Sequence, residues 1–211
     1  MPIFSIEGNI GSGKSSLLAK LKESSPELIF LQEPVDEWNT IKDADGTTIL
    51  EKYYQDQGRW AFAFQMMAFI TRVRQFKAAP KNVVVITERS VFTDREIFAK
   101  MLHDSGKISN IEYTIYLKWF DDLVGDLTID GVIYVNTTPE VCEQRIQKRA
   151  RPGETISFDY LEQCDIYHER WLREHPNKLV LNGDVGNPDD WVTDSLTFFL
   201  IQSAKCFFSP A

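Results

Sequence analysis

Short apolar runs recur along the chain, separated by longer stretches in which apolar positions follow helical spacing. The runs have the length and the Val, Ile, Leu and Phe content of buried β-strands. They are Ile3–Ile6, Leu28–Leu31, Val83–Ile86, Val132–Val135 and Leu179–Leu181, and the longest helical pattern runs from Thr48 to Phe76. Strands that alternate with helices predict an α/β fold, with a five-stranded parallel sheet flanked by helices on both faces.

No internal repeat, low-complexity tract or Pro/Gly-rich linker divides the chain, and we expect its 211 residues to form one domain spanning 1–211. We expect loops at 42–47, 80–82 and 182–190. The 43% hydrophobic and 26% charged residues match an ordinary globular protein. A formal net charge of -8 argues against a nucleic-acid-binding protein, so a polyphosphate ligand needs local positive charge.

Compartment signals are few. No apolar run approaches the roughly 18 residues needed to cross a bilayer, and the N-terminal MPIFSIEG enters a strand directly, which leaves no room for a signal or transit peptide. A reducing compartment is favoured by three cysteines, far apart and without metal-ligand spacing, at Cys142, Cys164 and Cys206. We expect a cytoplasmic protein, with a trimmed mitochondrial precursor as the alternative.

The segment SIEGNIGSGKSSLLAKL at 5–21 follows the first expected strand and matches G-x-x-x-x-G-K-[ST]. In such a loop backbone N–H groups turn toward phosphate oxygens, and the helix that follows adds positive potential. Lys14 is expected to reach the β- and γ-phosphates, and the Ser15 hydroxyl to bind Mg²⁺. An ordinary Gly-rich turn is the alternative. The expected ATP-binding residues of the loop are Gly8, Asn9, Ile10, Gly11, Ser12, Gly13, Lys14, Ser15 and Ser16.

Other users of a phosphate loop fit the chain less well. A GTPase needs N-K-x-D, and NKLV at 177–180 lacks the aspartate, while DADG at 43–46 follows no strand and is better read as a turn. A motor or transporter ATPase is usually larger. The short, alternating chain favours a kinase that acts on a small molecule.

Several segments resemble the deoxynucleoside kinase family, in family order and over most of the chain. They are LQEPVDEW at 31–38, RWAFAFQMMAFITRVR at 59–74, TERSVFTDREIFAK at 87–100, TPEVCEQRIQKRARPGE at 138–154 and YLEQCDIYHERWL at 160–172. Base-reading positions look most like the deoxycytidine and deoxyguanosine kinase branch. The resemblance implies a phosphate-loop kinase fold with an arginine-rich lid at about 145–156, ATP and Mg²⁺, a deoxynucleoside substrate, and a homodimer through helices beside the long one.

Three charged residues are expected at the carboxyl edge of the sheet, where open α/β folds bind ligands. Glu33 ends the second strand and can accept the proton of an attacking 5′-hydroxyl; the alternative is a surface glutamate before a loop. Glu88 follows the third strand and can hold Mg²⁺, and Arg89 can contact the 5′-oxygen or the transferred phosphate. A structural ion pair is the alternative for these two.

The lid supplies movable positive charge. Thr138 and Pro139 are typical of an N-cap and a first helical residue, so the helix is expected to run through Arg149. Arg149 and Arg151 are expected to close over the triphosphate and stabilise the transferring group. A basic helix end that favours its own dipole is the alternative.

Contacts to the sugar and to the donor base follow from the resemblance. Tyr54 and Glu154 match the pair that holds the 3′-hydroxyl. The family often has two acidic residues after the last lid arginine, whereas this chain has Gly153 at the first of these positions. Arg145 is expected near the donor's adenine on the same ground, whereas Asp184 and Val185 are expected there from the position of their loop after the last strand.

The acceptor's base is expected among residues of the long helix and its neighbours. Gln65, Ala68 and Arg72 are spaced i, i+3 and i+7, which places them on one helix face, and Asp94 is the natural ion-pair partner of Arg72. These residues suit bases with an amino group and disfavour thymine, with a helix-to-loop ion pair as the alternative. Apolar walls are expected from Trp38, Phe64 and Phe98, whose alternative is plain core packing.

Two other functions remain open at this stage. A thymidylate-kinase-like enzyme would phosphorylate a monophosphate, but it needs further arginines for the acceptor phosphate, and EPV with ERS fits a nucleoside better. A non-catalytic nucleotide-binding subunit is the second. The presence together of Lys14, Glu33, Glu88 and Arg89 argues against it.

Overall fold

The computed structural model describes residues 2–80, 83–151, 153–185 and 188–208. Within them one parallel sheet has the strand order β2-β3-β1-β4-β5. The strands are β1 (Ile3–Glu7), β2 (Ile29–Leu31), β3 (Val85–Glu88), β4 (Gly131–Asn136) and β5 (Lys178–Asn182). The expected fold class and the five expected strands are confirmed. Their ends move by up to two residues, so that Glu88 is the last residue of β3 and does not follow it.

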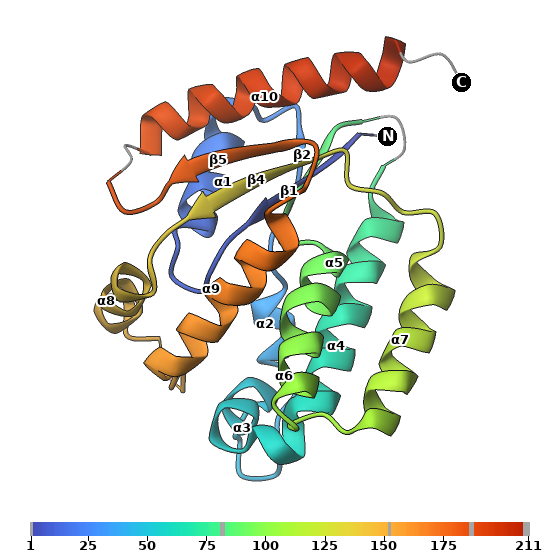
Figure 1. Cartoon of the computed structure of the whole chain (residues 1–211), viewed down its shortest axis with the longest axis vertical. Helices are drawn as coiled ribbons and strands as arrows, with labels where there is room; N and C mark the ends of the chain where they lie inside the picture. Colours follow the sequence, from blue (N-terminus) through green and yellow to red (C-terminus); the bar gives the residue numbers. More distant parts are fainter. Residues whose placement is uncertain (1, 81–82, 152, 186–187, 209–211) are drawn as a thin grey trace.

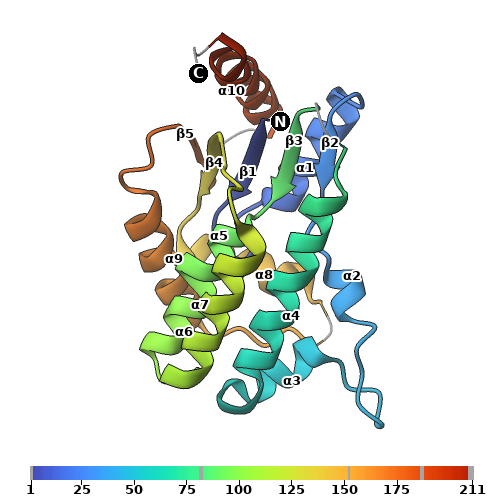
Figure 2. The same ribbon diagram turned by 90° about the vertical axis from the view of Figure 1, so that its right-hand side faces the viewer.

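Helices cover both faces of the sheet (Figures 1 and 2). On one face α1 (Lys14–Ser24) and α10 (Pro188–Phe208) pack against Phe4 and Ile6 of β1. On the other face α4 (Gln57–Ala78) and α7 (Asn110–Val124) pack against Ile3 and Val85. The other helices are α2 (Val35–Trp38), α3 (Ile49–Gln55), α5 (Val91–Thr93), the π-helix η1 (Asp94–Ala99), α6 (Lys100–Asp104), α8 (Pro139–Arg149) and α9 (Phe158–Leu172).

The long helix expected over 48–76 is two helices, which corrects that prediction. Asp56 leaves the helical region at φ -147° and ψ 83°, and this residue separates α3 from α4. Its carboxylate accepts the backbone N–H of Arg59 at 3.2 Å and so caps α4. Thr48 and Glu51 form a capping box at the start of α3. The Asp56 side chain binds a backbone N–H group of the next helix, and α3 ends there although the apolar spacing continues through it.

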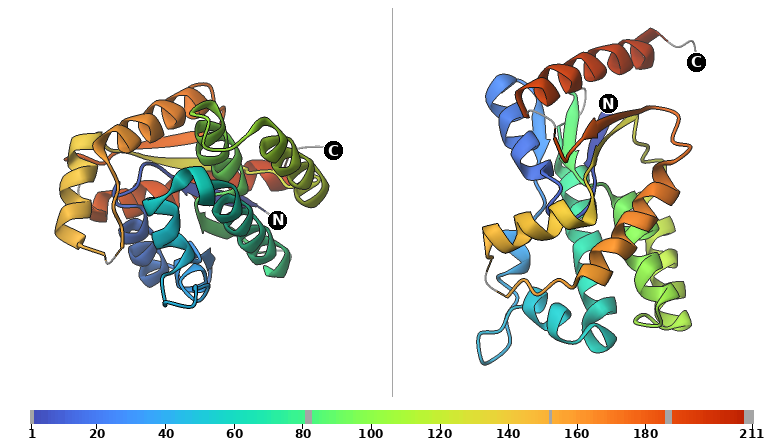
Figure 3. Two further views of the ribbon diagram at one scale, coloured as in Figure 1. Left: turned by 90° about the horizontal axis from the view of Figure 1, so that it is seen from below. Right: turned by 60° about the vertical axis from the view of Figure 1, so that its left-hand side comes forward.

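The lid helix begins and ends as the sequence indicates. Pro139 is the first residue of α8, Arg149 the last, and Ala150 ends the helix in the left-handed region. The segment that joins α8 to α9 runs past α3 (Figure 3). All strands are parallel, so the loops that follow β1, β2 and β3 open at one edge, beside this lid.

Two further observations concern the compartment. The cysteines whose side chains are described, Cys142 and Cys164, are free and buried. Across the described part of the chain, no helix combines the length and the apolar character needed to cross a membrane.

Candidate active site

A cavity of about 820 Å³ opens at the carboxyl edge of the sheet. Most of the residues expected from the sequence to bind or act on substrates line it. From the phosphate loop and the lid these are Ile10, Gly11, Gly13, Lys14, Ser15, Ser16, Arg145, Arg149, Arg151 and Glu154; from the remaining elements they are Glu33, Trp38, Tyr54, Phe64, Gln65, Ala68, Arg72, Glu88, Arg89, Asp94 and Phe98. Gly8, Asn9, Ser12, Asp184 and Val185 are not among the lining residues.

Two glycines of the phosphate loop lie where no side chain fits. Gly8 has φ 142°, and a Cβ there would come 2.5 Å from the carbonyl oxygen of Val135. Gly11 has φ 83°, and its Cβ would come 2.7 Å from the carbonyl oxygen of Cys142. Glycine is therefore required for the loop to approach β4 and α8 this closely.

Lys14 is the buried cation of this loop. Its Nζ donates to the carbonyl oxygen of Asn9 at 2.7 Å. Burial, followed by the charge of Arg89, lowers the pKa of Lys14 to about 8. The side chain lines the cavity, so its charge can act on an anionic ligand held there.

The two expected metal ligands meet directly. Ser15 Oγ, at the start of α1, donates to Glu88 Oε1, at the end of β3, across 2.5 Å. A hydroxyl and a carboxylate oxygen are donors that Mg²⁺ accepts, usually together with substrate phosphates. The pair fits such an ion. Among the described residues no three His, Cys, Asp or Glu side chains gather into a metal-binding group.

Glu33 lies two residues beyond β2, which corrects its expected place at the strand end. Its Oε1 is 3.2 Å from Arg89 Nε and 3.3 Å from Arg72 Nη2. Burial raises the pKa of Glu33, but the charges of Arg89, Arg72 and Lys14 outweigh it, and the net shift is downward. The side chain is 22% exposed and faces the cavity, so the structure holds an ionised carboxylate at this point.

Arg89 is fixed from three sides. Its backbone has φ 62°, a left-handed conformation that costs about 1–3 kcal/mol in a non-glycine residue. Its Nη1 donates to the carbonyl oxygen of Gly8 at 3.0 Å, and its guanidinium lies 5.0 Å from the centre of the Phe98 ring. The guanidinium therefore joins the phosphate loop to Glu33.

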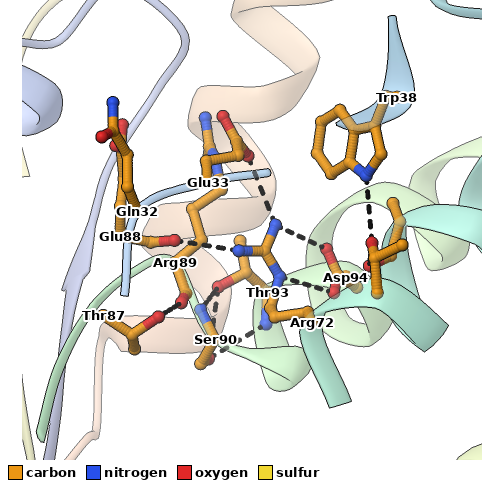
Figure 4. A network of polar contacts seen from close by, with 12 residues as sticks. Gln32, Glu33, Trp38, Arg72, Thr87, Glu88, Arg89, Ser90, Thr93 and Asp94 are labelled. Carbon is orange, nitrogen blue, oxygen red and sulfur yellow. Dashed lines mark hydrogen bonds and ion pairs between the residues drawn. The ribbon is translucent and has the colours of Figure 1, made fainter. Parts of the chain in front are cut away.

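Arg72 links the expected base-reading residues to Glu33 (Figure 4). Its Nε donates to Asp94 Oδ2 at 2.9 Å, so the expected ion pair is present. Its Nη1 donates to the carbonyl oxygen of Glu88 at 2.9 Å, while Nη2 reaches Glu33. Burial raises the pKa of Asp94 although Arg72 opposes the shift. One buried guanidinium thus positions two carboxylates that face the same cavity.

Aromatic rings form a wall beside these charges. Trp38 donates its indole N–H to Thr71 Oγ1 at 3.0 Å and meets the Phe64 ring edge-on, with ring centres 5.3 Å apart. Phe64 also stacks on Tyr53 at 4.6 Å. Gln65 beside them is only 2% exposed, and its Oε1 has no hydrogen-bond partner in the structure. This oxygen is closed to solvent and unpartnered, an arrangement that is rare in folded proteins.

The lid residues contact one another and the phosphate loop. Arg149 Nη2 lies 2.6 Å from one oxygen of Glu154 and 2.7 Å from the other, and Arg151 Nη1 lies 4.0 Å from this carboxylate. Arg145 donates to the carbonyl oxygens of Ser12 at 3.0 Å and Gly183 at 2.7 Å. Tyr54 lines the same cavity as Glu154.

The loop after β5 takes a structural role in this arrangement. Asp184 Oδ1 accepts the backbone N–H of Thr138 at 2.9 Å and its hydroxyl at 3.2 Å, and so caps the start of α8. Val185 is exposed. Their expected contact with an adenine stays a prediction.

Tyr53 and Tyr160 line the cavity and were not expected from the sequence. Their hydroxyl oxygens are 2.7 Å apart. Tyr53 precedes the expected sugar contact Tyr54, and Tyr160 opens a segment that carries the family resemblance. Those positions were the available signal, but 107 residues separate the two tyrosines and no spacing rule connects them.

A phosphate loop on a parallel sheet, facing an ionised carboxylate held by arginines, defines the class of phosphate-loop kinases that act on small molecules. The chain belongs to the deoxynucleoside kinase family, because the family model described as Deoxynucleoside kinase matches residues 4–202. It is therefore a kinase, an enzyme that transfers phosphate to deoxynucleosides.

The chain is similar to several named relatives. It is 41% identical over 203 residues to a probable deoxycytidine kinase of fowlpox virus (strain NVSL), covering 90% of this chain and 81% of the relative. Identity with deoxycytidine kinase 2 of Gallus gallus is 37% over 194 residues, covering 81% and 73%. Identity with the mitochondrial deoxyguanosine kinase of Xenopus laevis is 35% over 197 residues, covering 83% and 74%.

Proposed function

We propose that this chain transfers the γ-phosphate of ATP, or of another nucleoside triphosphate, to the 5′-hydroxyl of a deoxynucleoside, and prefers deoxycytidine and deoxypurine nucleosides to thymidine. The observation that carries the proposal is the Arg72 guanidinium, which joins the cavity-facing Asp94 to Glu33 beside the phosphate loop. It supports the proposal because the carboxylate that would read the base and the one that would accept the proton share one buried guanidinium.

Glu33 is the general base. Its lowered pKa keeps it ionised at neutral pH, so it accepts the proton of the 5′-hydroxyl. The 5′-oxygen then bonds to the γ-phosphorus, and the bond to the oxygen bridging the β- and γ-phosphates breaks, which releases the diphosphate. Arg89 holds the carboxylate and contacts the entering oxygen or the transferred phosphate.

Positive charge stabilises the transferring group. Lys14 acts from the phosphate loop, and Arg149 and Arg151 act from the lid. Ser15 and Glu88 hold Mg²⁺, which neutralises phosphate charge when it is bound. Arg149 now bonds to Glu154, so a bound triphosphate would compete with that carboxylate for the guanidinium.

Sugar and donor-base contacts complete the proposal. Tyr54 and Glu154 bind the 3′-hydroxyl, while Arg145, Asp184 and Val185 contact the donor's adenine. Trp38, Phe64, Ala68 and Phe98 enclose the acceptor's base, and Gln65 meets its polar edge. The support is that all but Asp184 and Val185 line one cavity.

A steady-state comparison of the four deoxynucleosides with ATP tests the function. We expect turnover with deoxycytidine and with deoxyadenosine or deoxyguanosine, and a low kcat/KM for thymidine. The four deoxynucleoside monophosphates serve as controls for a thymidylate-kinase-like activity. Product formation from a monophosphate alone would overturn the proposal, as would nucleotide binding without ADP release. Thymidine as the best substrate would overturn only the base preference.

We also propose a homodimer. Ile111, Ile115 and Trp119 are exposed at i, i+4 and i+8 on α7, and Ile70 is exposed on α4, which packs beside it. Apolar side chains that are exposed together on one face, as these are, mark a protein–protein interface more often than a single exposed one does. Sedimentation equilibrium should give twice the 24.3 kDa chain mass, and Trp119→Glu should shift it toward the monomer. A monomeric wild type would contradict this.

For the compartment we propose the cytoplasm, with the free, buried Cys142 and Cys164 as support for a reducing environment. Fractionation of expressing cells against cytoplasmic and mitochondrial markers tests this. Enrichment with the mitochondrial marker would favour the trimmed form.

A further inference from the structure

The peptide groups on both sides of Arg89 are held by hydrogen bonds. On the near side the backbone N–H of Arg89 donates to the carbonyl oxygen of Ile6 at 3.0 Å. On the far side the carbonyl oxygen of Arg89 accepts the hydroxyl of Thr87 at 2.8 Å. The N–H of that same peptide group, which belongs to Ser90, donates to Thr93 Oγ1 at 3.1 Å (Figure 4). Both polar atoms of the peptide group that follows Arg89 are therefore bound by threonine hydroxyls.

A buried carboxyl group holds one of these threonines. Thr93 Oγ1 donates to Glu7 Oε2 at 2.5 Å. Glu7 is the last residue of β1, directly before the phosphate loop, and both side chains are closed to solvent. The single hydroxyl proton of Thr93 goes to Glu7, and its lone pairs are left to accept the N–H of Ser90. Glu7 thus sets the direction of the hydroxyl that holds the backbone after Arg89.

The backbone of Arg89 needs such support. Its φ of 62° is in the left-handed region, which an arginine leaves unless its surroundings hold it there. The direction in which the guanidinium leaves the backbone depends on this conformation. With the peptide groups fixed, Arg89 Nε lies 3.2 Å from Glu33 Oε1, and Nη1 donates to the carbonyl oxygen of Gly8 at 3.0 Å. A relaxed backbone would carry the guanidinium away from these partners.

We propose that two threonines and a glutamate are positioning residues for phosphoryl transfer, namely Thr87, Thr93 and Glu7. They keep Arg89 in its left-handed conformation, with its guanidinium between Glu33 and the phosphate loop. None of the three is among the residues that line the cavity, so they act through Arg89 and not on a substrate. The inference rests on the proposed function and deepens it, because it names what holds the arginine beside the proposed general base.

Removal of the hydrogen-bonding groups tests the proposal. Thr87→Val and, separately, Thr93→Val keep the shape of the side chain without its hydroxyl, and Glu7→Met removes the acceptor. We expect kcat with deoxycytidine and ATP to fall about tenfold in each, while the deoxycytidine KM changes less than about threefold. Thr93→Ser keeps the hydroxyl and Glu7→Gln keeps an acceptor oxygen, so both should stay within about threefold of the wild-type kcat. Thr87→Val removes a single hydrogen bond, which keeps the test decisive if Glu7→Met does not fold.

The pH dependence of kcat separates positioning from a general loss of stability. Among the positive charges that lower the pKa of Glu33, that of Arg89 has the largest effect, followed by those of Arg72 and Lys14. The further titratable groups that interact with this carboxyl are Asp94 and Tyr54. When the Arg89 guanidinium moves away, burial is less opposed and the pKa of Glu33 rises. The ratio of variant to wild-type kcat should therefore fall between about pH 7.5 and 5.5, since more of the base is protonated.

Tyr134→Phe is the matched control. Tyr134 is paired with Glu7 in the sheet, and the variant also loses a buried hydroxyl bonded to a glutamate, Glu169 at 2.9 Å. Its kcat and pH dependence should equal those of the wild type.

The outcomes are separable. The inference is overturned if kcat is unchanged in the three disruptive variants, or if it falls by the same factor at every pH. It is also overturned if Thr93→Ser or Glu7→Gln loses as much kcat as the disruptive change at the same position, or if Tyr134→Phe behaves like the disruptive variants. A wild type that phosphorylates none of the four deoxynucleosides overturns the proposed function itself, which is therefore tested apart from the inference.

Discussion

Glu33 is held between two guanidinium groups that reach it from different parts of the fold, Arg72 from α4 and Arg89 from the residue after β3. Their positive charge outweighs the effect of burial and lowers the carboxyl pKa. A base that is already ionised at neutral pH needs no proton loss before it acts. The same two contacts also fix the direction in which its free oxygen faces the cavity.

Glu33→Gln should lower turnover about a hundredfold or more, which is the usual contribution of a positioned base. The amide keeps the shape of the side chain but cannot take up the proton. Binding of ATP should stay nearly intact, and titration with an ATP analogue checks this. Turnover near that of the wild type would show that Glu33 only organises the arginines.

The lowered pKa of Lys14 leads to a prediction of how ATP binding depends on pH. Its pKa, lowered by burial to about 8, lies below the ordinary value, so the free enzyme loses this charge as pH rises through 8. The affinity for a non-hydrolysable ATP analogue should fall above pH 8, up to about tenfold per pH unit for one essential proton. A bound phosphate stabilises the charged form of Lys14 and so raises its pKa in the complex. The decline of kcat should therefore begin at a higher pH than the decline of kcat/KM. Constant affinity between about pH 7 and 9.5 would contradict this.

At the scale of elements, what could be predicted was local in the chain. The phosphate loop occupies consecutive residues between a strand and a helix, and Pro139 marks the start of α8. The break at Asp56 was missed because apolar spacing continues across it. The donor-base contact of Asp184 stays a prediction, and its contact with Thr138 could not be predicted because it depends on two loops that meet only in the fold.

Gly153, where the family often has an acidic residue, lies where a side chain does not fit in the conformation described. It has φ 74°, and a Cβ there would come 2.3 Å from Glu51 Cγ at the start of α3. An acidic side chain at this position would therefore clash with α3 in the conformation described. The structure leaves Glu154 as the acid that follows the lid arginines, and its side chain is 4% exposed.

Arg151→Ala should reduce kcat more than it weakens deoxynucleoside binding, because this lid arginine is proposed to act on the transferring phosphate. Its 4.0 Å contact with Glu154 is too long to hold that carboxylate, which Arg149 already binds at 2.6 Å. Steady-state kinetics with deoxycytidine and ATP separates kcat from KM. A rise in the deoxycytidine KM with kcat unchanged would contradict the assignment.

At the scale of the whole molecule, charge is unevenly distributed. The chain carries a formal net charge of -8, yet arginines and Lys14 gather around one cavity. This local excess can attract a polyphosphate to an acidic protein. Contacts between distant segments complete the site, and the sequence predicts only some of them. The Arg72–Asp94 ion pair was predicted from the opposite charges of the two residues, but the reach of Arg72 to Glu33 was not.

Replacing the Arg72–Asp94 pair should change which base the enzyme prefers. Arg72→Met alone would leave Asp94 buried without its partner, which is strongly destabilising, so both residues are changed together as Arg72→Met with Asp94→Ala. Thymine presents a carbonyl oxygen and a methyl group where the pair offers a carboxylate and a guanidinium. Each polar group that is wrongly paired with bound thymine costs about 1–3 kcal/mol of binding free energy, and the double variant removes this cost. The kcat/KM ratio of thymidine to deoxycytidine should therefore rise about tenfold to over a hundredfold.

The arrangement of Arg72 adds a second expectation to the same experiment. Its Nη2 also holds Glu33, so the double variant should lose some kcat with every substrate while the ratio shifts. The matched control is Arg74→Met with Glu37→Ala. These residues form an exposed ion pair, and Arg74 lies on the same helix as Arg72. That control should keep the wild-type ratio and kcat. If thymidine gains nothing in the Arg72 and Asp94 variant, the pair does not read the base and serves only to position Glu33.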